Sequence, residues 1–443
     1  MNYPEAVEYI DSFINYEKTA SWNYPEALKL DRMRALAKEL GNPQNAFDSV
    51  IVAGSKGKGS TAAILSSIFR MENLKVGLYT SPHLVDLRER IQVNGLLISE
   101  LRFTEIVEML RRVLNDYAWR KNPPTYFEML TAIAFYHFKQ MKIHVAVLEV
   151  GLGGLYDSTN IANAKVAGIT PVSLEHTDKL GKTVSKIAVQ KCGIIKGREI
   201  VVSGMQVPEA EAVIVKTAGE KEAELFRVGK EIKLFDRTHG GHFQKFDVKT
   251  PFGNYYELEL RLLGAHQIEN AAQAIGLAKA YEKKSLIKIS DAAVHQGILD
   301  AHWPGRLEKI SDRPLVLLDG AQNADSARRA IEAAHRHFDF HRLIVILGVS
   351  ADKDLSGILE EILPAASVVI ATQSENPRAL AAEAIAERAK ESGKEVHVEK
   401  ESAKALEKAA ESAGPDDLIL VTGSLYLVGE FKREGSLHGF ERI

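Results

Sequence analysis

The segment Val50-Ile-Val-Ala-Gly54-Ser-Lys-Gly57-Lys58-Gly59-Ser60-Thr61 begins as an apolar run and ends in a loop rich in glycine. The run is typical of a buried strand, and residues 60–72 after the loop have a helical pattern. Backbone N–H groups of such a loop converge, and the positive end of the next helix lies behind them. The segment therefore predicts a phosphate site, with Lys58 for the outer phosphates and Ser60 or Thr61 as a hydroxyl for Mg²⁺.

The match to the general phosphate-loop pattern is incomplete, because Gly59 separates Lys58 from Ser60. An ordinary turn between a strand and a helix can also contain glycine and lysine, so this alternative stays open from the loop alone. The strand before the loop and the helix after it are the context that phosphate binding requires.

The composition indicates a globular protein of more than one domain. The chain has 443 residues, of which 45% are apolar and 26% charged, and a formal net charge of −3. This length exceeds what one hydrophobic core usually supports, so we predict two domains. No basic cluster indicates a nucleic-acid surface, and no apolar run approaches the ~20 residues of a membrane span.

Cysteine content and the N-terminal segment bear on the compartment. Residues 1–5 lack the charged and apolar regions of a signal peptide. Cys192 is the single cysteine, so no internal disulfide can form, which is typical of a reducing compartment. We therefore expect a cytosolic protein, and the apolar helical pattern around Cys192 favours a buried structural thiol over a nucleophile.

Three polar residues stand out in apolar surroundings. Glu149 ends the apolar run 144–150, where a carboxylate beside a phosphate loop suits a second Mg²⁺ contact. A carboxylate that caps the glycine turn after it is the alternative. His176 follows the apolar run 166–172, and Lys191 lies in an otherwise apolar helical pattern. From residue type alone, His176 can be a surface histidine or a metal ligand, and Lys191 reads as a partly buried lysine.

Hydrophobic periodicity predicts strands that alternate with helices on both sides of a break near residues 300–305. Before the break we predict strands at 50–54, 76–80, 144–150, 166–172 and 200–203, and helices at 3–16, 25–40, 60–72, 100–114, 126–140, 184–195, 207–218, 266–283 and 287–299. Residues 226–263 alternate as an antiparallel ribbon. After the break, strands are predicted at 315–319, 342–348, 367–372, 395–399 and 417–422. The prediction is an α/β fold with domains 1–300 and 301–443.

Ten motifs in order resemble those of the folylpolyglutamate synthase/dihydrofolate synthase family of the Mur ligase superfamily. They are Ala53-Gly-Ser-Lys-Gly57-Lys58-Gly59-Ser60, Thr80-Ser81-Pro-His-Leu84 with Glu89-Arg-Ile91 and Asn94-Gly95, Tyr126-Phe-Glu128, Glu149-Val-Gly-Leu-Gly-Gly154, His176-Thr-Asp178 with Leu180-Gly181, Gly264-Ala-His266-Gln267-Ile-Glu-Asn270, Pro304-Gly-Arg306-Leu-Glu308, Leu318-Asp-Gly-Ala-Gln-Asn323, Asp352-Lys-Asp354 and Gly423-Ser-Leu-Tyr-Leu-Val-Gly429. The resemblance spans nearly the whole chain.

The resemblance implies a P-loop ATP-binding domain of Mur ligase type and a smaller C-terminal, Rossmann-like α/β domain of the glutamate ligase type. It implies an ATP-dependent ligase that adds L-glutamate to dihydropteroate, to (tetrahydro)folate or to both, through an acyl phosphate. The expected partners are these small molecules, with no nucleic acid and no membrane, and a monomer is expected.

Site residues follow from the resemblance position by position. Lys58, His176 and Lys191 are the implied catalytic residues, with Lys191 carbamylated; a monovalent cation is a further implied cofactor. The implied ATP contacts are Gly57, Lys58, Gly59, Ser60, Asn270, Arg306 and Asp319. The implied Mg²⁺ ligands are Ser60, Ser81, Glu149 and His176. The implied pterin contacts are Thr125, Tyr126, Phe127, Glu128, Tyr156, Asp157 and Ser158.

Some positions depart from the family pattern. Leu155 stands where the family has arginine, and Gln322 stands where it has histidine. Glu175 and Gln190 replace the acids that usually precede the metal histidine and the special lysine. The changes at 155 and 322 concern the substrate side, so they leave open which acid is accepted.

Three other functions remain to be weighed. A Mur-type ligase for a different acid would share the chemistry, but the peptidoglycan ligases carry a large N-terminal domain, and only about 48 residues precede the loop strand here. A P-loop phosphotransferase or nucleotide switch would have no use for the His176 and Lys191 pair. A homologue that binds folate without turnover is prompted by Leu155 and Gln322, and the complete metal set argues against it.

Overall fold

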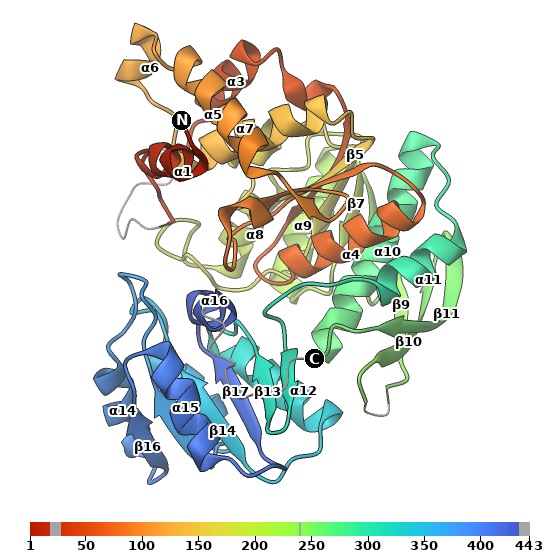
Figure 1. Cartoon of the computed structure of the whole chain (residues 1–443). Helices are drawn as coiled ribbons and strands as arrows, with labels where there is room; N and C mark the ends of the chain where they lie inside the picture. Colours follow the sequence, from red (N-terminus) through yellow and green to blue (C-terminus); the bar gives the residue numbers. More distant parts are fainter. Residues whose placement is uncertain (18–27, 239–240, 434–443) are drawn as a thin grey trace.

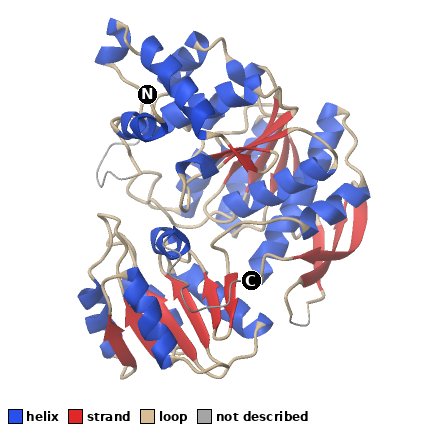
Figure 2. Cartoon of the chain, viewed as in Figure 1, coloured by secondary structure: helices blue, strands red, loops and turns tan. Residues whose placement is uncertain are grey.

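The structure is a computed structural model that describes residues 1–17, 28–238 and 241–433. Figure 1 shows the C-terminal part, in blue, below the first large sheet, with α16 (Leu425–Arg433) at the junction. Figure 2 shows three groups of strands with helices packed around them, which confirms the predicted α/β class. Within the described ranges, no helix combines the length and the apolar character that crossing a membrane requires.

The first sheet has eight strands in the order β4-β3-β2-β5-β1-β6-β7-β8. Their bounds are β1 (Asp48–Ala53), β2 (Val76–Tyr79), β3 (Ile91–Val93), β4 (Leu96–Leu97), β5 (Val145–Glu149), β6 (Val166–Ile169), β7 (Ile200–Ser203) and β8 (Glu224–Arg227). Strands β2, β5, β1, β6, β7 and β8 are parallel, whereas β3 and β4 extend the sheet antiparallel. The carboxyl ends of the parallel strands therefore share one edge, where open α/β sheets bind ligands.

Helices cover both faces of this sheet. They are α1 (Tyr3–Asp11), α3 (Leu30–Glu39), α4 (Lys58–Met71), α5 (Glu100–Val113), α6 (Tyr117–Lys121), α7 (Tyr126–Gln140), α8 (Val184–Cys192), α9 (Pro208–Glu220), α10 (Ala265–Ser285) and α11 (Asp291–Leu299). Side chains of β1 alternate between the two faces: Val50 and Val52 pack with α4 and α10, whereas Ile51 and Ala53 pack with α7 and α8. Burial on both faces explains why β1 is a continuous apolar run.

Two further sheets follow along the chain. An antiparallel sheet contains β9 (Lys233–Asp236), β10 (Gln244–Thr250) and β11 (Gly253–Leu260). The last sheet, β12-β13-β17-β14-β15-β16, contains β12 (Glu308–Asp312), β13 (Leu315–Leu318), β14 (Leu343–Leu347), β15 (Val368–Ala371), β16 (Glu395–Val398) and β17 (Leu418–Thr422). Its helices are α12 (Ala324–His337), α13 (Leu355–Ile362), α14 (Ala382–Lys390), α15 (Ser402–Ser412) and α16. All its strands except β12 are parallel.

Several predicted elements differ from those observed. The ribbon predicted from residue 226 was wrong at its start, because β8 joins the first sheet in parallel and only β9 to β11 are antiparallel. The helix predicted at 3–16 ends at Asp11, and the phosphate-loop helix begins at Lys58. Of the helix predicted at 25–40, residues 25–27 lie outside the described ranges, and the described helix starts at Leu30.

The connection between α11 and the last sheet is short. α11 ends at Leu299 and β12 begins at Glu308, on either side of the Pro and Gly that interrupt the helical pattern. We retain 1–300 and 301–443 as proposed domains.

Candidate active site

The loop after β1 turns sharply into α4. Gly57 precedes the helix with φ of 82°, a conformation that side chains with a Cβ rarely adopt. A Cβ there would also lie 2.3 Å from Asn270 Oδ1, so α10 approaches the loop backbone closely. The helix begins directly at Lys58, and its first N–H groups have no partners within the helix. This geometry suits an anion at the loop.

Two lysines converge on the start of the loop. Lys58 Nζ donates to the Gly54 carbonyl at 3.0 Å, and Lys191 Nζ donates to the same oxygen at 2.7 Å. Lys191 is 1% exposed, and its Nζ lies 2.6 Å from Glu175 Oε1. Burial lowers the pKa of Lys191 to about 8, although Glu175 acts against this shift. Burial opposes ionisation of Glu175, but Lys191 and Lys58 outweigh it and lower the pKa of Glu175 to about 2.

Glu149 ends β5, between β1 and β2, at the same sheet edge. Its side chain is buried, and its Oε2 accepts the backbone N–H of Ser81 at 3.0 Å. Burial raises the pKa of the Glu149 carboxyl, and Lys58 acts against this shift. Glu149 therefore supplies a carboxylate beside two hydroxyl side chains, those of Ser60 and Ser81, which line the same cavity.

His176 lies beside Glu175 and has φ of 44°. Burial lowers the pKa of its imidazole, with Glu175 acting in the opposite direction. Within the described ranges, no group of three or more His, Cys, Asp or Glu side chains could hold a metal ion. Glu149, Ser60 and Ser81 therefore do not form a complete metal site by themselves. They fit Mg²⁺ in its common mode of binding, in which one or two carboxylates act together with substrate phosphates and water.

One cavity of about 250 Å³ joins the phosphate loop to the last sheet. The cavity is lined by these predicted ATP and Mg²⁺ contacts: Gly57, Lys58, Gly59, Ser60, Ser81, Glu149, Asn270, Arg306 and Asp319. Asp319 follows β13, and its Oδ2 and Oδ1 accept the N–H groups of Leu307 and Ala321, both at 2.9 Å. Burial raises the pKa of Asp319, and Arg306 acts against the shift. His176 and Lys191 are not among the lining residues, and Lys191 contacts the start of the loop through the Gly54 carbonyl.

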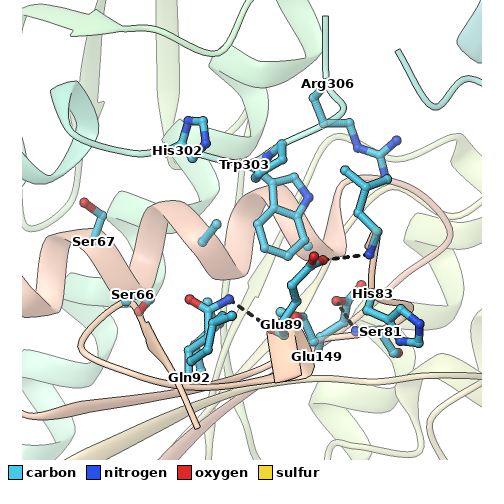
Figure 3. Close-up of a pocket in the computed structure, with 18 of the residues that line it drawn as sticks. Ser66, Ser67, Ser81, His83, Glu89, Gln92, Glu149, His302, Trp303 and Arg306 are labelled. Atoms are coloured by element: carbon cyan, nitrogen blue, oxygen red, sulfur yellow. Dashed lines mark hydrogen bonds between the residues drawn. The ribbon is translucent and has the colours of Figure 1, made fainter. Parts of the chain in front are cut away.

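A second cavity of about 450 Å³ adjoins the first and shares Gly59, Ser81, Glu149 and Arg306 with it. Figure 3 shows the Trp303 indole between Arg306 and Glu89, with Glu149 and Ser81 at one end and Ser66 and Ser67 at the other. A Cβ at Gly59 would lie 2.7 Å from the Trp303 ring. The absence of a side chain at Gly59 thus lets an aromatic wall stand directly beside the phosphate loop.

None of the predicted pterin residues lines either cavity. Thr125 and Glu128 cap α7, and Glu128 Oε2 also accepts Arg32 Nε at 2.6 Å. Asp157 accepts the N–H groups of Gly151, Leu152 and Thr159 at 3.0 to 3.1 Å. These polar side chains therefore hold local structure. The remaining predicted residues, Tyr126, Phe127, Tyr156 and Ser158, lie in the same two segments.

The two substrate-side departures lie in different surroundings. Leu155 packs at the end of α8, where its N–H donates to the Gln190 carbonyl at 2.9 Å. A Cβ at Gly193 would lie 2.4 Å from Leu155 Cβ, so the backbone of residue 155 packs closely against the end of α8. Gln322 lines the first cavity, and its N–H donates to Ser326 Oγ at 3.1 Å.

Sequence reasoning missed several residues at the site. Trp303 lies in the segment assigned to the domain break, and its aromatic ring beside Pro304 and Gly305 was the available signal. Lys56 is inside the phosphate loop, yet its side chain contacts Asp325 of α12. That contact joins segments 269 residues apart, so no local pattern could indicate it.

Two family profiles match the chain: "Mur ligase middle domain" over residues 52–278 and "Mur ligase, glutamate ligase domain" over residues 305–425. Folylpolyglutamate synthase of Lacticaseibacillus casei is 35% identical over 439 residues, covering 98% of each chain. Dihydrofolate synthase/folylpolyglutamate synthase of Bacillus subtilis is 31% identical, covering 95% of this chain and 99% of that protein. The crystal structure of Mycobacterium tuberculosis folylpolyglutamate synthase with ADP and AMPPCP superposes with a TM-score of 0.86 at 32% identity, over 95% of this chain and 97% of that one.

Proposed function

Because this chain belongs to the folylpolyglutamate synthase/dihydrofolate synthase family of Mur ligases, we propose that it adds L-glutamate to dihydropteroate, to a (tetrahydro)folate or to both. The reaction class, an ATP-dependent ligation of an acid to an amino acid, follows from the family. The observation that carries the proposal is the cavity shared by the phosphate loop and the last sheet, which continues past Glu149 into the aromatic cavity.

The first cavity is assigned to ATP. Gly57, Gly59 and Ser60 would surround the phosphates with backbone N–H groups, and Lys58 would exchange its bond to Gly54 for one to an outer phosphate. From the facing side, the ATP contacts would be Asn270, Arg306 and Asp319. Phosphoryl transfer depends mainly on positioning and positive charge, which these groups supply.

The metal site is assigned to Glu149, Ser81 and Ser60, which line the same cavity. When bound there, Mg²⁺ would neutralise charge on the phosphates. Burial disfavours the ionised form of Glu149, so a cation bound beside it would offset the free energy needed to keep the carboxylate charged. His176 as a ligand and a monovalent cation remain part of the proposal, supported by the family resemblance.

The second cavity is assigned to the acceptor acid. Its aromatic wall suits a flat ring system, and its Glu149 end brings the acid's carboxylate to the phosphates. A carboxylate oxygen would attack the γ-phosphorus and release ADP. The glutamate amine would then attack the acyl carbon, lose a proton and displace phosphate. The last sheet covers this point and would exclude water from the acyl phosphate.

Lys191 is assigned to carbamylation. Its neutral amine would add to CO₂ and release a proton, and a pKa near 8 provides that neutral form at moderate pH. The product would place a second carboxylate behind the loop, next to Glu175. We also propose that the protein acts in the cytosol and as a monomer, as the sequence analysis predicted.

An ATP hydrolysis assay with and without glutamate tests this function. A ligase releases phosphate only when the acid and glutamate are both present. Phosphate release that ignores glutamate would favour a P-loop phosphotransferase or nucleotide switch, and would contradict the proposal.

A further inference from the structure

Lys56 differs from Lys58 although both belong to the phosphate loop. Lys58 turns back onto the Gly54 carbonyl at the pocket. Lys56 instead extends away from the loop backbone, and its Nζ lies 2.5 Å from Asp325 Oδ2. The backbone around Lys56 is also fixed, because the N–H groups of Ser55 and Lys56 both donate to the Pro171 carbonyl, at 3.0 and 3.3 Å. Both lysines line the cavity between the loop and the last sheet, and Lys56 also forms an ion pair with α12 of that sheet.

Asp325 lies in the first turn of α12 and gathers three cations. Besides Lys56, it accepts Arg328 Nη2 at 2.6 Å and Arg329 Nε at 3.1 Å. Burial acts against ionisation of Asp325, but Lys56 and Arg329 outweigh it and hold its pKa well below the usual range. Asp325 is therefore a carboxylate at neutral pH, available for the ion pair.

The start of α12 also forms one wall of the nucleotide cavity. Asn323, Ser326, Arg329 and Ala330 line it, opposite the phosphate loop. The far end of the helix is fastened separately: Arg336 Nη1 lies 2.7 Å from Asp236 Oδ2 of β9. A helix of 14 residues is about 21 Å long, so the two ion pairs hold α12 at points well separated from each other.

We infer that Asp325 is a positioning residue for nucleotide binding: through Lys56 it holds the wall formed by α12 against the phosphate loop. The inference rests on the proposed function, because it takes the cavity to be the ATP site. The ion pair joins the loop to the last sheet directly, so the position of α12 and the order of the loop depend on each other.

A simple electrostatic account predicts the opposite sign for one variant. Asp325 is a negative charge near a site for a polyanion, so its neutralisation alone would strengthen nucleotide binding. If Asp325 positions the wall and the loop, its neutralisation weakens binding instead. Asp325→Asn therefore separates the two accounts.

The test is equilibrium titration of the full chain with Mg²⁺ and the ATP analogue AMPPCP, which binds without turnover. Asp325→Asn and Lys56→Met are each expected to weaken binding about two- to fivefold, the range of a partly exposed ion pair. The double variant is expected to bind no more weakly than Lys56→Met alone, because both changes remove one interaction.

Two matched variants serve as controls. Arg336→Gln removes the ion pair at the far end of α12, and Arg328→Gln removes an exposed cation from Asp325 itself. Both are expected to bind AMPPCP within twofold of the wild type. Thermal unfolding of every variant would show that the chains compared are folded.

Unchanged or tighter binding by Asp325→Asn, or equal weakening by Arg336→Gln, would overturn the positioning role while the ATP assignment stands. A wild-type chain that does not bind AMPPCP would overturn the ATP assignment, and the inference with it.

Discussion

The carboxyl ends of the two large parallel sheets meet at one cavity, but they carry different chemistry. The first edge presents backbone N–H groups, Lys58 and the Glu149 carboxylate; the second presents Asp319 and the residues that lead into α12. Glu149 is buried and Asp319 partly buried, and burial raises the pKa of each. Their hydrogen bonds separate them: both oxygens of Asp319 accept backbone N–H groups, whereas Glu149 accepts that of Ser81 with Oε2.

This difference indicates a division of roles between the two edges. Glu149 keeps a carboxylate oxygen for a ligand or metal, while Asp319 first shapes its own loop. The first edge is therefore suited to the reacting groups, and the second to closing the site and orienting the nucleotide.

The largest expected effect belongs to the first edge. Lys58→Ala should lower glutamate-dependent phosphate release about 10²–10³-fold, because it removes the mobile charge nearest the phosphates. The measurement is a phosphate-release assay at saturating substrates. Lys216→Ala, on the exposed surface of α9, is the control and should leave the rate unchanged. A Lys58→Ala rate within threefold of the wild type would contradict the role of the phosphate loop in ATP binding and phosphoryl transfer.

Glu149→Gln should reduce turnover about 100-fold and raise the Mg²⁺ concentration that is required, because an amide is a weaker metal ligand. It should not lower stability, since the amide can still accept the Ser81 N–H.

The pH dependence of that stability has a definite sign. Burial raises the pKa of Glu149 in the folded state, so ionisation opposes folding above the ordinary glutamate range. The variant should therefore be more stable than the wild type at neutral pH, and the difference should vanish below pH 4. Denaturant unfolding at several pH values measures this. A variant less stable than the wild type at pH 7 would make Glu149 a structural acid like Asp319.

Lys191→Ala should lower turnover about 10–100-fold, the usual effect of losing a group that supports a metal site. Added formate or acetate should restore part of the rate, since a small carboxylate can replace the proposed carbamate. The neighbouring buried residue provides the control, and Cys192→Ala should retain activity. Full activity in Lys191→Ala would leave this lysine with a structural role only.

Asp319→Asn is expected to act more on stability than on chemistry. The amide group of asparagine would face one of the two backbone donors with its own N–H groups, which costs about 1–3 kcal/mol of unfolding free energy. Turnover at saturating ATP should fall less than in Glu149→Gln. If the two variants lost turnover equally with unchanged stability, the contrast between the two edges would be wrong.

The parallel strands were predictable because their burial on both faces leaves continuous apolar runs, as in β1 and β5. The short edge strands were not: β12 is polar, Glu308-Lys-Ile-Ser-Asp312, and pairs antiparallel to β13. The predicted ribbon, which began at residue 226, included the end of β8, although β8 pairs in parallel with β7; only this tertiary pairing assigns it to the first sheet.

The cavity lining was predictable where polar residues sit at strand ends, as for Lys58, Ser81 and Glu149. It was not predictable where one sheet meets the other. The ion pair of Lys56 with Asp325 and the wall formed by Trp303 arise from contacts between distant segments. The sequence analysis also did not identify Glu128 as a capping residue of α7.

The most direct test of the central claim is the mass of the product formed with ATP, Mg²⁺ and L-glutamate, with dihydropteroate and tetrahydrofolate supplied in separate reactions. At least one of the two acids should gain a single glutamyl unit for each phosphate released. Phosphate release with neither acid extended, or no release at all, would contradict the assigned substrates.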